Sequence, residues 1–326
     1  MNTYPFGTYD TVNKIFVFNP DFDKPIEEEY YEVLAGECVE VKFSNAFNQS
    51  IDNLPRNIKK IITGRDFNQE INNLHEGLEE INLGNSFNQR IDNLPRSLKK
   101  IIILNNFNNS IDNLPLDLEE LFFIGNFDQS LDFVPLNLIK ITINGKFNKP
   151  IHNLLFLNKL KFIRLCGEFN QEIEHCLCDN VERIYLGSKF NKRISSGIPK
   201  NLKKIVFGKE FNHSIDELPD SVEEISLMGT EDVTPDQINV NTSYFQQKIH
   251  KLPTNLKYLF IHREYEHIES LKEMPNLEIK EYFSRDECYE MYYEGYICIN
   301  KNNTSEPPFD ETNRNYIRNY IDYHRI

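Results

Sequence analysis

The feature that most constrains this chain is a phrase that returns every 20 residues. Phe, Asn, two variable residues and Ile stand together at Phe47–Ile51, and close copies have their Phe at 67, 87, 107, 127 and 147. Further copies begin at Phe169, Phe190 and Phe211, and weaker ones at Phe22 and Phe245 bring the total to eleven between about residues 14 and 280. Such a period is typical of a solenoid, in which each copy stacks on its neighbours.

Each copy also contains a short strand phrase. In residues 98–103 the pattern L-x-x-I-x-I turns Leu98, Ile101 and Ile103 inward and Ile102 outward, because successive side chains of a strand alternate. Three more apolar anchors follow in this copy, at Phe107, Ile111 and Leu114. The roughly fourteen residues between strand phrases are rich in turn formers and Pro, which predicts short 3₁₀ or extended segments rather than regular helices.

An Asn follows the Phe in nearly every copy. Stacked side chains at this position can satisfy the backbone groups that leave the sheet where the chain turns. The sequence therefore predicts a structural Asn ladder, formed by Asn48, Asn68, Asn88, Asn108, Asn148, Asn170, Asn191 and Asn212.

The phrase F-N-x-x-I-D-N-L-P before a new strand, as in residues 87–98, resembles the FNIP repeat family over roughly four fifths of the chain. The family is regarded as a leucine-rich-repeat relative, found chiefly in social amoebae and in giant DNA viruses that infect them, with no enzymatic activity attributed to the repeat. The resemblance implies a β-rich, right-handed arc with a parallel sheet on its concave face. Some members carry an F-box, but only about a dozen residues precede the first strand candidate, Lys14–Phe18, so we expect none here.

Three regions are expected. Residues 1–37 form an N-terminal capping repeat, residues 38–280 form the array with an insertion at 229–244, and residues 281–326 form a Tyr-rich helical cap or tail. A capping box at Ser284–Glu287 predicts a helix to about Tyr293, and the apolar spacing from Tyr316 to Ile321 predicts a second. This tail either seals the open end of the array or docks on a partner.

Two sets of outward strand positions are candidate binding surfaces. The leading positions alternate between Lys and Glu pairs from rung to rung, which favours a self-neutralising ion ladder over a charge-reading site. The following positions include apolar groups that we predict to face solvent and bind a partner: Ile102, Leu104, Phe122, Ile124, Phe162 and Tyr185. The alternatives are that such residues simply suit strands, or that another part of the chain covers them.

Composition narrows the function. A net charge of −14 argues against binding to nucleic acid or anionic membranes, and no apolar run has the length of a membrane span. We see no secretory signal, and the six cysteines fit neither a disulfide framework nor a zinc motif, so we expect an intracellular protein, in the cytoplasm, or in the host cytoplasm if the source is viral. No catalytic, cofactor or metal motif is present.

The sequence therefore predicts a non-catalytic scaffold that binds a protein partner through the concave strand face. One alternative is a structural or self-assembling component, although a monomer is favoured. Another is a substrate-recruiting subunit of a ubiquitin ligase that lacks its own F-box. The identity of the partner is not encoded in any motif.

Overall fold

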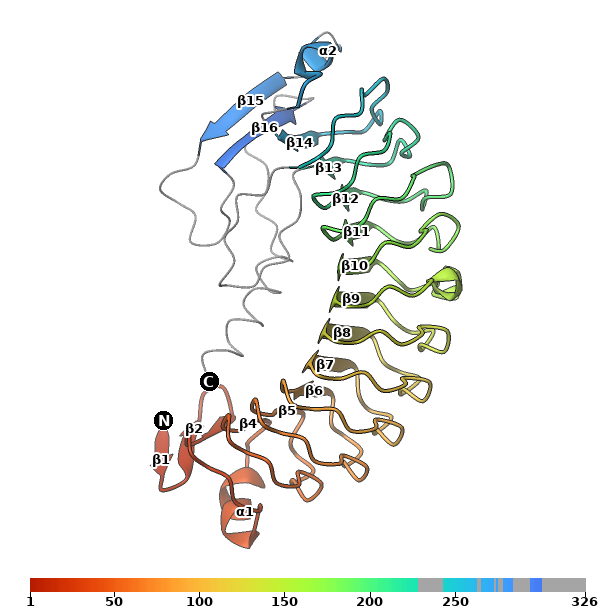
Figure 1. Ribbon diagram of the computed structural model, residues 1–326. Helices are drawn as coiled ribbons and strands as arrows, with labels where there is room; N and C mark the ends of the chain where they lie inside the picture. Colours follow the sequence, from red (N-terminus) through yellow and green to blue (C-terminus); the bar gives the residue numbers. More distant parts are fainter. Residues whose placement is uncertain (228–242, 263–264, 273, 275–277, 284–293, 301–326) are drawn as a thin grey trace. The chain divides into compact units, whose positions relative to one another are not determined.

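The computed structural model describes residues 1–227, 243–262, 265–272, 274, 278–283 and 294–300 (Figure 1). Two compact units divide the chain: unit 1 runs to Ile143 and unit 2 begins at Asn144. Each unit is a stretch of β-solenoid, as predicted. We call one turn of the solenoid, a strand with its following turn segment, a rung.

Unit 1 begins with an antiparallel cap and continues as a parallel sheet. Strands β1 (Asn2–Tyr4), β2 (Gly7–Asp10) and β3 (Ile15–Phe18) pair antiparallel, and helix α1 (Glu28–Leu34) follows. From β3 onward each strand pairs parallel with the next: β4 (Glu40–Lys42), β5 (Lys60–Ile62), β6 (Glu80–Leu83), β7 (Lys100–Asn105) and β8 (Glu120–Gly125). Strand β9 (Lys140–Gly145) spans the boundary between the units.

Unit 2 repeats this arrangement and ends differently. A short 3₁₀ helix, η1 (His152–Phe156), precedes four consecutive parallel pairings among β10 (Phe162–Gly167), β11 (Arg183–Leu186), β12 (Lys204–Val206), β13 (Glu224–Ser226) and β14 (Tyr258–His262). Helix α2 (Ile268–Lys272) comes next. Strand β16 (Glu294–Asn300) then pairs antiparallel with both β14 and β15 (Glu278–Phe283).

The antiparallel ending was not predicted, and the predicted helical cap stays a prediction. The described part of residues 281–326 consists of the end of β15 and all of β16, which are strands. The helices predicted over 284–293 and 316–321, and nearly all of the 229–244 insertion, lie outside the described residues. Strand β16 occupies the edge of β14 that the repeat pattern itself leaves open, so β15 and not β14 is the last strand at this end of the sheet.

In unit 1 the parallel register follows the 20-residue period of the sequence. Lys60 pairs with Glu80 and Glu80 with Lys100, so each residue lies beside its equivalent in the next rung. The Phe of the repeat is buried in every rung, and within each unit its ring stacks on that of the preceding rung: Phe47, Phe67 and Phe87 are 6.3 and 6.1 Å apart between ring centroids. These rings, with the buried Ile and Leu of each rung, form the core that single copies lack.

Candidate functional site

The strand side of unit 1 carries an ion ladder along its leading edge. The Lys60 ammonium lies 3.6 Å from the Glu40 carboxylate and 3.5 Å from that of Glu80, and the Lys100 ammonium lies 3.4 Å from Glu80 and 3.9 Å from Glu120. Each charge thus faces opposite charges on the neighbouring rungs. This geometry supports the interpretation of the alternating Lys and Glu pairs as a self-neutralising ladder. Each exposed ion pair contributes at most about 1 kcal/mol to the free energy of folding.

Unit 2 has a similar ion ladder between neighbouring rungs. Lys204 lies 2.7 Å from Glu224, and Glu223 is held between Lys257 at 2.6 Å and Lys203 at 3.4 Å. The hydrogen bond from Lys257 is the largest effect that lowers the pKa of Glu223 below its ordinary value of 4.5. The carboxylate is therefore held in its charged form.

The predicted binding residues of unit 1 form one cluster on the strand side. Ile102, Leu104 and Phe122 pack together, with Ile124 against them, and we call these four side chains the strand-face cluster. The first three are only 6, 4 and 5 % exposed, and Ile124 is half-buried. The prediction that these side chains face solvent was therefore wrong, although their place on the outward side of β7 and β8 agrees with the alternation.

Lysine side chains account for part of this burial. The ammonium groups of Lys100 and Lys140 lie 5.5 and 5.0 Å from the ring centroid of Phe122. A Lys that places its charge over a ring also lays its aliphatic stem along the apolar surface below it. The contact between these lysines and Phe122 could have been predicted from the sequence, because Lys100 on β7 and Lys140 on β9 stand on the rungs to either side of Phe122.

In unit 2 the remaining two predicted residues lie together as well. Phe162 and Tyr185 have ring centroids 5.2 Å apart and pack with Val206. They are 7 and 1 % exposed, so the expected exposure was wrong here too. The Arg164 guanidinium lies 4.6 Å and the Lys204 ammonium 5.6 Å from the centroid of the Tyr185 ring, so two cationic groups lie over this ring.

The Asn positions form a ladder of hydrogen bonds on the turn that follows each strand. Within each unit the backbone N–H that follows the Phe donates to the side-chain oxygen of the Asn one rung earlier, at 2.9 Å for Asn68 to Asn48 and for Asn191 to Asn170. Asp23 accepts the corresponding bond from Asn48, and Asn212 accepts one from Gln246. These side chains are engaged with the backbone, as a structural role requires.

A Cys and a His lie close enough in unit 2 to suggest a nucleophile and its base. The Nδ1 atom of His152 is 3.1 Å from the Sγ atom of Cys176. Cys176 is completely buried, however, and burial followed by the nearby Glu172 and Glu174 carboxylates raises the pKa of its thiol. A protonated thiol without solvent access is a poor nucleophile. Cys38, Cys166 and Cys178 are likewise buried, and none of these cysteines forms a disulfide.

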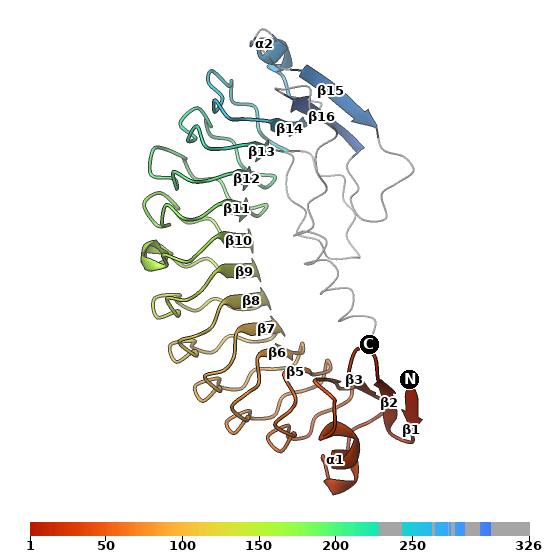
Figure 2. The same ribbon diagram turned by 180° about the vertical axis from the view of Figure 1, so that it is seen from behind.

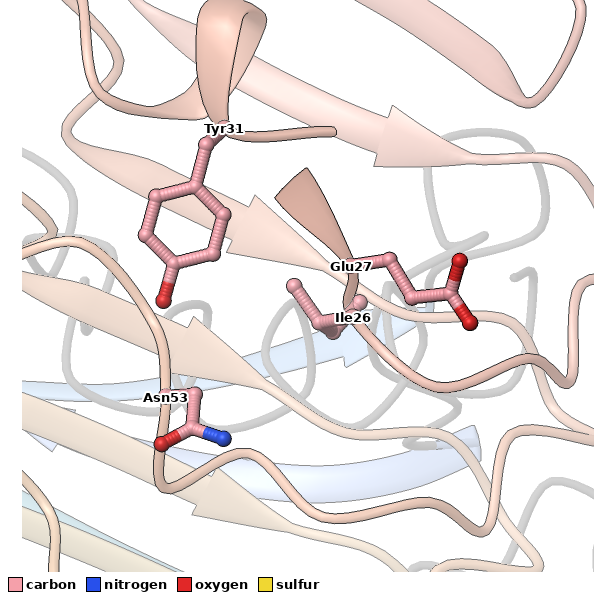
Figure 3. A pocket seen from close by; sticks show the side chains of 4 residues that line it. All are labelled: Ile26, Glu27, Tyr31 and Asn53. Atoms are coloured by element: carbon pink, nitrogen blue, oxygen red, sulfur yellow. The ribbon is translucent and has the colours of Figure 1, made fainter. Parts of the chain in front are cut away.

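One pocket, of about 720 Å³, lies beside the start of α1 and is lined by Ile26, Glu27, Tyr31 and Asn53. Figure 3 shows the Tyr31 hydroxyl directed toward Asn53, while the Glu27 carboxylate points away from both. These four side chains provide a single carboxylate with no paired acid or base. Across the described residues, no three His, Cys, Asp or Glu side chains are grouped so as to hold a metal ion, and no helix is long and apolar enough to cross a bilayer.

Comparison with known proteins agrees with this architecture. Residues 47–86 and 190–229 match the FNIP repeat. Among solved structures, CroV588, described as a novel circular LRR protein, is similar with a TM-score of 0.53 and 24% sequence identity over 77% of this chain. The match covers 50% of that protein, so this chain spans about half of its length. No curated protein is similar in sequence.

Proposed function

Because the chain is an FNIP repeat protein with a leucine-rich-repeat-like fold, we propose that it is a non-catalytic scaffold that binds a protein partner through its strand face. The observation that carries the proposal is the strand-face cluster, a second group of apolar side chains on the side of the sheet opposite the Phe core. The solenoid core does not need it, since the equivalent of Phe122 is Asn82 in one rung and Thr142 in another.

The way a partner would engage this cluster follows from its burial. Ile124 is the most accessible of the four side chains, and Lys100 and Lys140 lie over Phe122. A partner would contact Ile124 first and could displace the two lysine stems to reach the ring, since such stems move readily on a protein surface. Carboxylates on the partner would compensate the displaced ammonium groups.

The kind of partner and its compartment are part of the same proposal. An acidic chain of net charge −14 repels nucleic acid and anionic lipid, which leaves proteins as the favoured ligand class. Four buried free thiols suit a reducing compartment, so we propose an intracellular location.

Affinity capture from the cells that make the protein tests the strand face. Ile124→Glu places a charge at the accessible edge of the cluster and should remove the specific partner, while Val39→Glu makes the same kind of change at a partly exposed position of unit 1 outside the cluster. Both variants should keep the wild-type melting temperature. Phe122→Glu would be a poorer choice, because it buries a charge and threatens folding. If Ile124→Glu captures the same proteins as wild type, the strand face is not the binding surface.

A further inference from the structure

A polar side chain interrupts the apolar row on the strand face of unit 1. Asn82 lies in β6, where it pairs with Ile62 of β5 on one side and with Ile102 of β7 on the other (Figure 2). Its chain neighbours Ile81 and Leu83 are fully buried in the core, so the alternation of the strand turns Asn82 to the strand face. Asn82 therefore stands directly beside the strand-face cluster, of which Ile102 is a member.

The side-chain oxygen of Asn82 is buried and unpaired. The residue is only 8 % exposed, and solvent does not reach its Oδ1 atom. Within the part of the chain that the structure describes, this oxygen accepts no hydrogen bond. A buried acceptor that lacks a donor lowers the stability of the fold, and native proteins keep few such groups. The amide of Asn82 therefore needs a reason other than folding.

The repeat itself shows that the solenoid does not require an amide at this position. The equivalent residues of the other rungs in unit 1 include Ile62, Ile102, Phe122 and Thr142. An apolar residue at position 82 would continue the row between Ile62 and Ile102 and would leave no polar atom unpaired. Asn82 is thus unfavourable for folding where its neighbours show that a favourable residue fits, which is typical of a residue kept for binding.

The surroundings of Asn82 favour a neutral donor on a side chain. Glu80, two residues earlier on the same face, already lies 3.5 Å from the Lys60 ammonium and 3.4 Å from that of Lys100. A charged donor would enter this balanced group with its own charge unpaired, which is costly in a buried place. The two flanking isoleucines stand on the adjacent strands, about 4.8 Å away on either side, and keep a partner's main chain at a distance. A neutral side chain can pass between them.

On the basis of the strand-face function proposed above, we propose that Asn82 recognises the side-chain amide of a Gln in the protein partner. The NH₂ group of that Gln donates to the Oδ1 atom of Asn82, and its carbonyl oxygen can accept from the NH₂ group of Asn82 in return. An apolar residue two positions away in an extended segment points the same way as the Gln and packs on the strand-face cluster. The partner is thus read by one amide and one apolar contact.

Lys100 controls access to both contacts. Its ammonium lies 3.4 Å from Glu80 on β6 and 5.5 Å from the ring centroid of Phe122 on β8, so this side chain reaches across the face between the two strands. Binding at the cluster already requires that Lys100 move, and lysine stems move readily on a protein surface. The same movement opens the part of the face that contains Asn82 to a Gln side chain.

A double-mutant cycle between the full chain and two synthetic peptides tests this recognition. Both peptides have about 12 residues. One has the central sequence Glu-Gln-Ser-Leu-Glu, and the other replaces its Gln by Met, which has the same length and no amide. Fluorescence anisotropy measures their affinities for wild type and for Asn82→Leu. We expect wild type to bind the Gln peptide roughly fivefold more tightly than the Met peptide, and Asn82→Leu to prefer the Met peptide.

Thermal unfolding separates recognition from a structural role of Asn82. Asn82→Leu removes the unpaired oxygen and installs an apolar residue like those of the neighbouring rungs, so its melting temperature should equal or exceed that of wild type. A lower melting temperature would show that the amide supports the fold, and would overturn the proposal.

The binding data have two further outcomes that count against recognition by Asn82. An equal preference of wild type and Asn82→Leu between the two peptides would overturn it, and so would the absence of measurable binding of the Gln peptide to wild type. Ile124→Glu tells the two proposals apart. If this variant binds both peptides as wild type does, the strand face is not the binding surface. If it weakens both while Asn82→Leu leaves the preference unchanged, only the recognition of the amide fails.

Discussion

The backbone N–H of Asn88 donates a hydrogen bond of 2.9 Å to the side-chain oxygen of Asn68, one full rung earlier in the chain. The same oxygen accepts a second bond, at 3.2 Å, from the side chain of Gln89. One Asn therefore satisfies a backbone donor that the turn has removed from the sheet and also anchors a side chain of the next rung. Each such contact fixes the register between two rungs.

Replacing Asn68 by Ala should lower the free energy of unfolding by about 1–2 kcal/mol, because the N–H of Asn88 loses its acceptor. Asn68→Asp keeps an acceptor oxygen and should cost clearly less. The chain itself uses Asp for this purpose at Asp23. Urea unfolding of the two variants measures the difference, and equal destabilisation by Ala and Asp would show that the oxygen is not what matters.

Replacing a stacked, buried Phe of the repeat by Ala should lower the free energy of unfolding far more than the same change at the exposed Phe133. Phe87 is fully buried and stacks between Phe67 and Phe107 with centroid distances of 6.1 Å on each side, so Phe87→Ala should cost about 3–5 kcal/mol. Phe133→Ala makes the same chemical change at a side chain that is 69 % exposed, and should stay within about 0.5 kcal/mol of wild type. Thermal unfolding of both variants tests the comparison, and similar losses would contradict the assignment of the repeat Phe to the core.

Much of the fold was predictable because one period fixes the inward residues. The buried positions of Leu98, Ile101 and Phe107 follow from spacing alone, and so does the pairing of Lys100 with Glu80. Helix α1 was not predicted, since a single seven-residue helix leaves little periodicity to detect. The antiparallel end of the sheet was missed for a related reason: β16 belongs to no repeat, so no second copy showed where it pairs.

The candidate sites were less predictable than the fold. Alternation correctly turned Phe122 away from the Phe core, but the direction of a side chain does not determine its exposure: Phe122 packs against Ile102 and Leu104, and two Lys ammonium groups lie over its ring.

Gly125 should tolerate no side chain. Its φ of +111° lies in a region that other residues rarely adopt, and a Cβ atom there would collide with the backbone of Asn105 in the adjacent rung. We therefore expect Gly125→Ala to lower the free energy of unfolding by about 2 kcal/mol or more. Gly36→Ala is the control, because the nearest atom to its added Cβ, the Val33 carbonyl oxygen, is 3.9 Å away. A wild-type urea midpoint for Gly125→Ala would contradict this account.

Lowering the pH should reduce the folding stability of unit 2, because Glu223 becomes protonated. Its pKa is lowered in the folded protein, chiefly by the hydrogen bond from Lys257 and with help from Lys203, so folding favours its charged form. The resulting stability is fully present above the ordinary pKa of 4.5 and is lost as the pH falls through the lower value of the folded state.

We therefore expect Glu223→Gln to be less stable than wild type at neutral pH, and the gap between their urea midpoints to shrink as the pH falls below 4.5. High salt at neutral pH should narrow the gap as well, because the pair is partly exposed. Glu217→Gln removes an exposed carboxylate that lies outside the ladder and serves as the matched control. A gap that stays constant across this pH range would mean that Glu223 acts through packing and not through its charge.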